Sequence, residues 1–218
     1  MKKLITLALA LIMAMTMTVA ASAAFVSSPS ANDGPVIEDV VNEDGDEVSN
    51  VVLTPYKDRA DLDAEAKKDM EEAYDDIKGA DKLTDLVEGL DDAADKAGAK
   101  EEDLAVKDLF NLSTEDGEEL DGKVTITLKA EDAKNFVALI VKEGDAWVVV
   151  PDVEFDKKNG TITFDAEALG TFAIVVNNKE KDSPATSNAF DFSVLFMVGT
   201  VVFGAAAAFC FAKSRVNG

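Results

Sequence analysis

The chain has 218 residues, and its 43 acidic against 21 basic side chains give it a formal net charge of −22. Such a field repels phosphate groups, which excludes nucleic acid as a partner. The sequence has no histidine and a single cysteine, Cys210. It therefore lacks the usual general base and zinc ligand, and no disulfide holds together the chain before Cys210.

The N-terminal end has the pattern of a secretory signal peptide. Two lysines form a positive start, an uncharged apolar run follows, and the small residues Ala21 and Ala23 stand at the positions that a signal peptidase reads. The pattern predicts cleavage before Ala24, so residues 1–23 are left out of the fold. An uncleaved signal anchor is the alternative.

Residues 24–50 are poor in large apolar side chains and rich in Ser, Pro, Asn, Asp and Glu, which predicts an acidic, disordered and mobile leader. Within it, residues 42–47 faintly resemble a calcium-binding loop. The segment lacks the later spaced ligands and the bidentate Glu of an EF-hand loop, so a solvated acidic turn is the favoured interpretation. We expect no metal, no cofactor and no catalytic residue in this chain.

Two amphipathic helices are predicted next. The first has Asp61 or Asp63 as its N-cap and ends at Gly79, and the second ends at Gly98. Gly89 weakens the second helix. The apolar stripes of the two helices are Leu62, Ala66, Met70, Ala73, Tyr74 and Ile77, and then Leu83, Leu86, Val87, Leu90, Ala94 and Ala97.

From Leu104 onward the apolar residues recur with a period of two, which is typical of half-buried strands. Asn159 and Gly160 form a hairpin signal before the strand at 161–164. The pattern predicts an α+β domain over residues 51–177, in which the two helices pack against an antiparallel, immunoglobulin-like β-sandwich. The predicted strands are 51–54, 104–110, 124–128, 136–141, 147–150, 161–164 and 172–176. The aromatic side chains expected in the core are Trp147, Phe164 and Phe172.

The C-terminal end has the pattern of a membrane anchor. Residues 192–212 contain no charged side chain, and a helix of about 20 residues spans the hydrocarbon core of a bilayer. A linker, residues 178–191, precedes this predicted transmembrane helix, and a basic tail, residues 213–218, follows it. Basic residues favour the cytoplasmic side, so we expect the tail inside and the domain outside. The exported part then carries 17 basic against 43 acidic side chains, a net charge of −26.

Ser183, Pro184, Ala185, Thr186 and Ser187, followed by the apolar run and the basic tail, resemble the cell-wall sorting signal of Gram-positive surface proteins. That signal is a Leu-Pro-x-Thr-Gly or Ser-Pro-x-Thr-Gly pentapeptide, an apolar helix and a basic tail. The resemblance implies sortase as a partner, whose cysteine would attack the carbonyl of Thr186. The family has glycine where this chain has Ser187, and a side chain narrows the backbone conformations at that position. We therefore expect slow processing, which leaves most copies in the membrane.

The stretch 51–176 also resembles an uncharacterised module of Firmicutes surface proteins. This resemblance implies a helix-plus-sandwich fold and a surface location, but no activity. The matching pieces are Leu53-Thr54-Pro55-Tyr56, Ala73-Tyr74-Asp75-Asp76-Ile77, Val106-Lys107-Asp108-Leu109-Phe110-Asn111-Leu112-Ser113 and Gly170-Thr171-Phe172-Ala173-Ile174.

Motifs for catalysis are missing from the sequence: it has no glycine-rich phosphate loop and no Gly-x-Ser-x-Gly elbow. Carboxylates are abundant enough to leave a glycosidase pair open, although few aromatic residues remain to line a sugar cleft. A covalent bond of Lys107 or Lys123 with Asn177 or Asn178 is also open, and solvent-facing side chains are the favoured interpretation there.

We therefore expect a non-enzymatic display, binding or structural protein at the bacterial cell surface. A single span holds it in the membrane, or it is joined to the cell wall where sortase processes it. Its ligand would be an extracellular protein or a glycan. The alternative is an accessory enzyme domain that acts on cell-wall polymer or on extracellular glycan.

Overall fold

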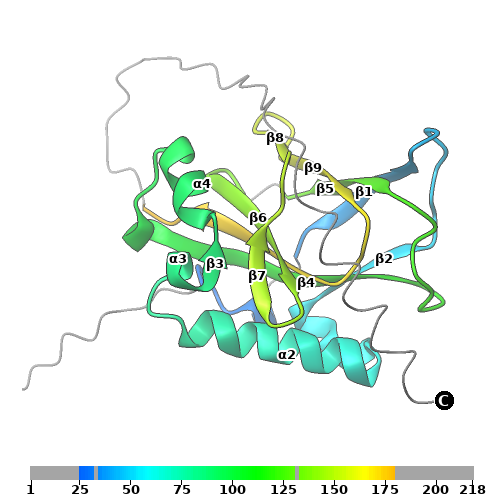
Figure 1. The fold of residues 1–218 in the computed structure, drawn as a ribbon, viewed down its shortest axis with the longest axis horizontal. Helices are drawn as coiled ribbons and strands as arrows, with labels where there is room; N and C mark the ends of the chain where they lie inside the picture. Colours follow the sequence, from blue (N-terminus) through cyan, green and yellow to red (C-terminus); the bar gives the residue numbers. More distant parts are fainter. Residues whose placement is uncertain (1–24, 32–33, 131–132, 180–218) are drawn as a thin grey trace, which may run out of the picture. The chain divides into compact units, whose positions relative to one another are not determined.

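The computed structural model describes residues 25–31, 34–130 and 133–179, which form two β-sheets and a helical layer (Figure 1). The strands are β1 (Val36–Asn42), β2 (Val51–Pro55), β3 (Val87–Glu88), β4 (Leu104–Thr114), β5 (Val124–Lys129), β6 (Phe136–Glu143), β7 (Ala146–Val149), β8 (Glu154–Asp156), β9 (Thr161–Ala166) and β10 (Thr171–Asn177). The α-helices are α2 (Ala64–Gly79), α3 (Leu83–Leu86) and α4 (Leu90–Ala97), and the 3-10 helices are η1 (Pro29–Ala31), η2 (Tyr56–Asp61) and η3 (Glu101–Asp103).

The two sheets have different sizes and are almost entirely antiparallel. The six-stranded sheet has the order β2-β4-β10-β6-β7-β3, and the four-stranded sheet has the order β1-β5-β9-β8. Among these neighbours, β3 and β7 form the parallel pair. The predicted α+β class with antiparallel strands in a sandwich-like arrangement is therefore confirmed. The predicted turn before β9 also forms, and in it the Gly160 N–H donates to the Asp156 carbonyl at 2.7 Å. The strand that pairs with β9 across this turn, β8, was not predicted.

Large apolar side chains fill the space between the two sheets. On β10, Phe172, Ile174 and Val176 belong to this core, which we call the sandwich core. The Phe172 ring stacks on Phe110 with 6.0 Å between centroids and lies 5.6 Å from the ring of Phe164. Phe164 and Phe172 are each only 2% exposed, so the prediction that they are core residues is confirmed.

A second core, the helix-side core, lies between the helices and the other face of the six-stranded sheet. Helix α2 begins after Asp63, whose carboxylate accepts the N–H groups of Glu65 and Ala66, each at 2.9 Å, as expected of an N-cap. Trp147 of β7 is 1% exposed in this core, which confirms that prediction too. The fully buried residues of the predicted α2 stripe are Met70, Ala73 and Ile77.

The second helix does not run unbroken through residues 83–97, so that prediction is wrong. The strand β3 splits it into α3 and α4. Gly89 has a φ of 81°, in the left-handed region that favours glycine, and a right-handed helix cannot continue through it. Val87 pairs instead with Trp147 of β7. Ala97, which was expected to face inward, is exposed.

Residues 24–50 are not a mobile leader over the part that the structure describes, so that prediction is also wrong. They contain β1, an edge strand that pairs with β5. Val40 is buried in the sandwich core, whereas Glu38 and Asp39 are exposed and the register shifts at Glu38. A single buried residue on an acidic strand leaves no clear alternation in the sequence.

Within the described ranges, no helix is long and apolar enough to cross a bilayer. The predicted signal peptide, residues 1–23, and the predicted transmembrane helix, residues 192–212, lie outside those ranges.

Candidate functional site

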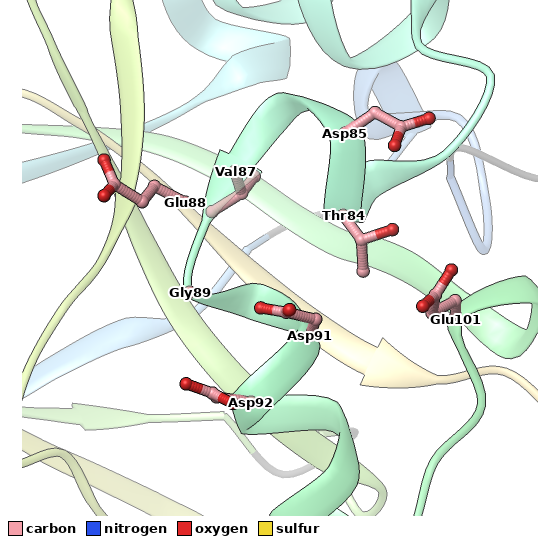
Figure 2. A pocket seen from close by; sticks show the side chains of 8 residues that line it. All are labelled: Thr84, Asp85, Val87, Glu88, Gly89, Asp91, Asp92 and Glu101. Carbon is pink, nitrogen blue, oxygen red and sulfur yellow. The ribbon is translucent and has the colours of Figure 1, made fainter.

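The candidate site is a hollow of about 540 Å³ beside the break between α3 and α4 (Figure 2). We call it the acidic hollow. Five of its lining side chains are carboxylates, and none carries a positive charge or an aromatic ring. The lining residues are Thr84, Asp85, Val87, Glu88, Gly89, Asp91, Asp92 and Glu101.

The acidic hollow owes its place to the turn at Gly89. The helical backbone is interrupted there, between α3 and α4. Next to this break, Val87 is 2% exposed and is held by its strand pairing with Trp147. Asp91 and Asp92 lie in the first turn of α4, where negative charge interacts favourably with the helix dipole. The sequence signal for this hollow was a glycine inside an acidic helical pattern, and it predicted a weak helix rather than a break.

The carboxylates of the acidic hollow do not converge on one point. In Figure 2 the side chains of Asp85 and Glu88 point to opposite sides of the hollow. Over the part of the chain that the structure describes, no group of three or more Asp, Glu, Cys or His side chains is placed to hold a metal ion. The arrangement therefore gives a negative potential that attracts cations without the ligand geometry of a metal site.

Glu101 has a cationic partner at one end of the hollow. Its Oε2 accepts a hydrogen bond from Nζ of Lys82 at 2.9 Å, and about half of each side chain is exposed. The hydrogen bond to Glu101 and the negative charge of that carboxylate raise the pKa of Lys82 above its ordinary value. An exposed pair of this kind contributes little to stability, and its role is to tie η3 to the start of α3.

A second hollow, of about 400 Å³, lies between the end of α2 and α3. Its lining residues are Asp75, Asp76, Gly79, Ala80, Lys82, Asp85 and Leu86. Nζ of Lys142, on β6, donates to Oδ2 of Asp76 at 2.9 Å, and the Lys142 side chain is only 8% exposed. This ion pair fastens α2 to the six-stranded sheet.

Three buried side-chain atoms have no hydrogen-bond partner in the described structure: Nε of Arg59, Oδ1 of Asn111 and Nε1 of Trp147. Nε of Arg59 lies 3.5 Å from Oε1 of Glu71, its ion-pair partner, and Nδ2 of Asn111 lies 3.5 Å from Oγ1 of Thr171. None of the three residues lines either hollow. The unpaired atoms therefore belong to the packed layers and add no chemistry to the candidate site.

Residues 42–47 form a turn in which a side chain of the turn accepts hydrogen bonds from the turn's own backbone N–H groups. Oδ1 of Asn42 accepts the N–H groups of Asp44 at 3.0 Å and of Asp46 at 2.8 Å. This is an Asx-type turn, and it agrees with the favoured interpretation as a solvated acidic turn.

The sequence-predicted site residues fall mostly beyond the described ranges. Ala21, Ala23 and Ala24 at the predicted cleavage site, and the sorting-like motif Ser183-Pro184-Ala185-Thr186-Ser187, lie outside them.

Of the candidates for a Lys–Asn bond, Lys123 and Asn177 lie at different sheets. Lys123 precedes β5 and its Nζ lies 2.7 Å from Oδ2 of Asp165, whereas Asn177 ends β10 and its Oδ1 accepts the Lys179 N–H at 3.0 Å. Each of the two side chains is therefore engaged with a neighbour of its own.

In comparisons of this chain with known protein families, with curated proteins and with solved structures, no match was found.

Proposed function

We propose that this chain is a non-enzymatic protein of the bacterial envelope that displays an acidic binding domain outside the cell on a single C-terminal span. The observation that carries the proposal is the extent of the fold. Among the described residues, Phe25 already forms a bridge with Val106, and Lys179 still forms an ion pair with Asp103. The folded domain therefore takes up the interval between the two predicted targeting segments, as an anchored surface protein requires.

Both ends of the domain are fastened to the six-stranded sheet or its flank. The Val26 N–H donates to the Val106 carbonyl at 2.9 Å, and the Asn178 N–H donates to the Asp103 carbonyl at 2.8 Å. Nζ of Lys179 lies 3.4 Å from Oδ2 of Asp103. The described domain thus includes the first residues of the predicted linker, which supports a role for the segment that follows in displaying the domain.

The charge of the exported part supports a cationic partner. With a net charge of −26 the exported part repels anionic lipid and nucleic acid, while the acidic hollow brings five carboxylates together on the surface of the domain. The proposed ligand is an extracellular protein with a basic surface or a glycan that carries amino groups.

The finer features of the proposal come from the sequence patterns. The sandwich is immunoglobulin-like, a view supported by two antiparallel sheets that share one core. The span at 192–212 and its basic tail hold the protein in the membrane. Sortase acts slowly at Thr186, because Ser187 stands in the place of the family's glycine.

Two epitope tags on the full chain test the proposed topology. One tag is inserted at Gly117, in an exposed turn of the domain, and the other follows Gly218. On intact cells an antibody should label the Gly117 tag and reach the C-terminal tag only after permeabilisation. A Gly117 tag that is hidden on intact cells would exclude the proposed surface location.

A pair of charge-neutralised variants tests the role of the acidic hollow. Cross-linking on intact cells should capture a basic envelope component, and this capture should fall when Glu88, Asp91 and Asp92 become amides. Neutralising three exposed carboxylates of the loop at 115–119 is the matched control and should leave capture unchanged. Equal losses in both variants would show a dependence on net charge alone.

A further inference from the structure

The turn between β8 and β9, residues 157–160, contains a chemically labile pair, Asn159 and Gly160. Asparagine is among the thermolabile residues, and glycine has no Cβ to shield its backbone nitrogen from the preceding side chain. That nitrogen can attack the amide carbon of the asparagine wherever the backbone is free to bring the two atoms together. Within the described ranges, Asn159 is the only asparagine that glycine follows, and its side chain is exposed to water.

Asp156, at the end of β8, holds this pair in place. Its Oδ1 accepts the N–H groups of Lys158 at 2.8 Å and of Asn159 at 3.2 Å. Its Oδ2 accepts a hydrogen bond from Nδ2 of Asn159 at 2.7 Å. The Gly160 N–H donates to the Asp156 carbonyl at 2.7 Å. The attacking nitrogen and the amide group that it would attack are therefore both bonded to Asp156.

The end of β5 fixes the backbone on both sides of the same peptide bond. Nζ of Lys129 donates to the Asn159 carbonyl at 2.6 Å, and the Ala130 N–H donates to the Gly160 carbonyl at 2.7 Å. Gly160 itself is buried. An attack on Asn159 requires the Gly160 nitrogen to turn away from Asp156, so several of these hydrogen bonds must break first. The folded turn therefore protects Asn159, and local opening exposes it.

We propose that Asn159 is a deamidation site that is closed in the folded turn and reacts when β8 separates from β9. The Gly160 nitrogen forms a bond with Cγ of Asn159, and the bond between Cγ and Nδ2 breaks. Nδ2 leaves as ammonia and takes the proton of the Gly160 N–H with it. Water then opens the resulting succinimide ring at either of its two carbonyl carbons, which leaves aspartate or isoaspartate in place of Asn159.

The product does not restore the turn. A carboxylate replaces the amide that donates to Oδ2 of Asp156, so two like charges meet where a hydrogen bond was. Strand β8 is the edge strand beside β9, and its Phe155 stacks on Phe136 of β6 with 5.0 Å between centroids. Phe155 also packs against the sandwich core. One opening event is therefore converted into a lasting loss of cover at this edge of the sandwich.

Peptide mapping by mass spectrometry on the purified full chain in detergent tests the proposal. The chain is incubated folded and, in parallel, unfolded in urea, and the deamidated fraction at Asn159 is followed over time. Asp156→Ala removes the side-chain acceptor, whereas Asp156→Asn keeps an oxygen that accepts N–H groups. Asp116→Ala is the matched control, because it removes the acceptor of another turn, where Oδ1 of Asp116 accepts the Glu118 N–H at 3.2 Å. Circular dichroism shows which chains are folded before incubation.

In the parent chain, Asn159 should react at least about tenfold more slowly when folded than in urea, because opening the turn at a cost of about 1.4 kcal/mol leaves it open about a tenth of the time. Folded Asp156→Ala should react several-fold faster than the folded parent, and Asp156→Asn should lie between the two. Asp116→Ala should match the parent, and all four chains should react equally in urea.

Equal rates for the parent chain in the folded state and in urea would overturn the proposal. So would a folded Asp156→Ala chain that reacts no faster than the folded parent, or a chain in urea that does not react at Asn159. If Asp156→Ala does not fold, the comparison of Asp156→Asn with the parent decides in the same way. None of these rates depends on where the protein is located, so the test is independent of the proposed function.

Discussion

The two faces of the six-stranded sheet are packed in different ways, although one strand serves both. From β10 the residues Phe172 and Ile174 enter the sandwich core, and Ala173 and Val175 enter the helix-side core. Large rings fill the space between two sheets, which pack about 10 Å apart. Small residues at Ala173 and at Ala73 of α2 let the helix approach closely. The comparison teaches that rings from two sheets fill the sandwich core, whereas the helix-side core combines large side chains such as Trp147 with small residues at the helix contact and with fastening contacts.

Phe172→Ala should have the largest effect on stability. Phe172 is 2% exposed and contacts the rings of Phe110 and Phe164, so its truncation leaves a cavity at the centre of the sandwich core. We expect a loss of about 3–5 kcal/mol in the free energy of unfolding, measured by urea denaturation of residues 24–181. Phe172→Leu keeps most of the volume and should cost clearly less. An unchanged melting temperature for Phe172→Ala would contradict the assignment of β10 to this core.

Asp76→Asn should have the next largest effect, because it breaks a contact that fastens α2. The Lys142 side chain is only 8% exposed, and without the Asp76 carboxylate its ammonium group loses its ionic partner. We expect a loss of about 2 kcal/mol in the free energy of unfolding. On the same helix, Glu72→Gln breaks an exposed pair with Lys68 and should cost clearly less. Equal costs for the two variants would mean that burial of Lys142 has no energetic role.

Two glycines of the helical layer should respond to alanine in opposite directions. A Cβ at Gly79 or at Gly89 meets no atom within 4 Å, so backbone conformation alone decides each outcome. Gly89→Ala places a side chain at a φ of 81° and should destabilise the domain by about 1–2 kcal/mol. Gly79→Ala, at the last residue of α2, should stabilise it by about 0.5–1 kcal/mol. Thermal melts of the two variants that shift in the same direction would contradict the break assigned to Gly89.

Asp165→Asn should have the smallest effect and a defined pH dependence. Burial alone would raise the pKa of Asp165, but hydrogen bonds from Lys123 and Thr125 and the charge of Lys123 together lower it. A lowered pKa in the folded state stabilises the protein above the unfolded pKa of about 3.9, and this gain is lost as the pH falls through the folded value. Because the side chain is 46% exposed, we expect a difference from the parent of only about 0.5 kcal/mol near pH 7. That difference should shrink below about pH 4 in acid-unfolding curves; a constant difference would contradict the ionic role.

Local patterns predicted most of the fold because most elements carry their own signal. The N-cap at Asp63 needs only its own carboxylate and the N–H groups that follow, and the β-branched and aromatic apolar run from Phe172 marks a strand without knowledge of its partner. The strand β1 was missed because its burial depends on pairing with β5, distant in the sequence, and because Glu38 and Asp39 are exposed. Residue composition alone predicts that such an acidic segment is a disordered leader.

The candidate site was harder to predict than the fold. The acidic hollow exists only because the helix breaks at Gly89 and because Val87 pairs with Trp147, about sixty residues later in the chain. The apolar residues between 83 and 97 have the same three- and four-residue spacing in an unbroken helix. This spacing therefore could not distinguish a continuous helix from a broken one. Gly89 was visible in the sequence, but the pairing of Val87 with β7 was not.

The most direct test of the central claim is the mass of the mature protein released from cells by two separate treatments. Detergent should release a chain that begins at Ala24 and still carries Arg215, as a processed and membrane-held surface protein requires. A wall-digesting muramidase, applied alone, should release little protein. Release by muramidase only, with a new C-terminus at Thr186, would contradict the membrane anchor. A chain that keeps residues 1–23 in every fraction would contradict the export assignment itself.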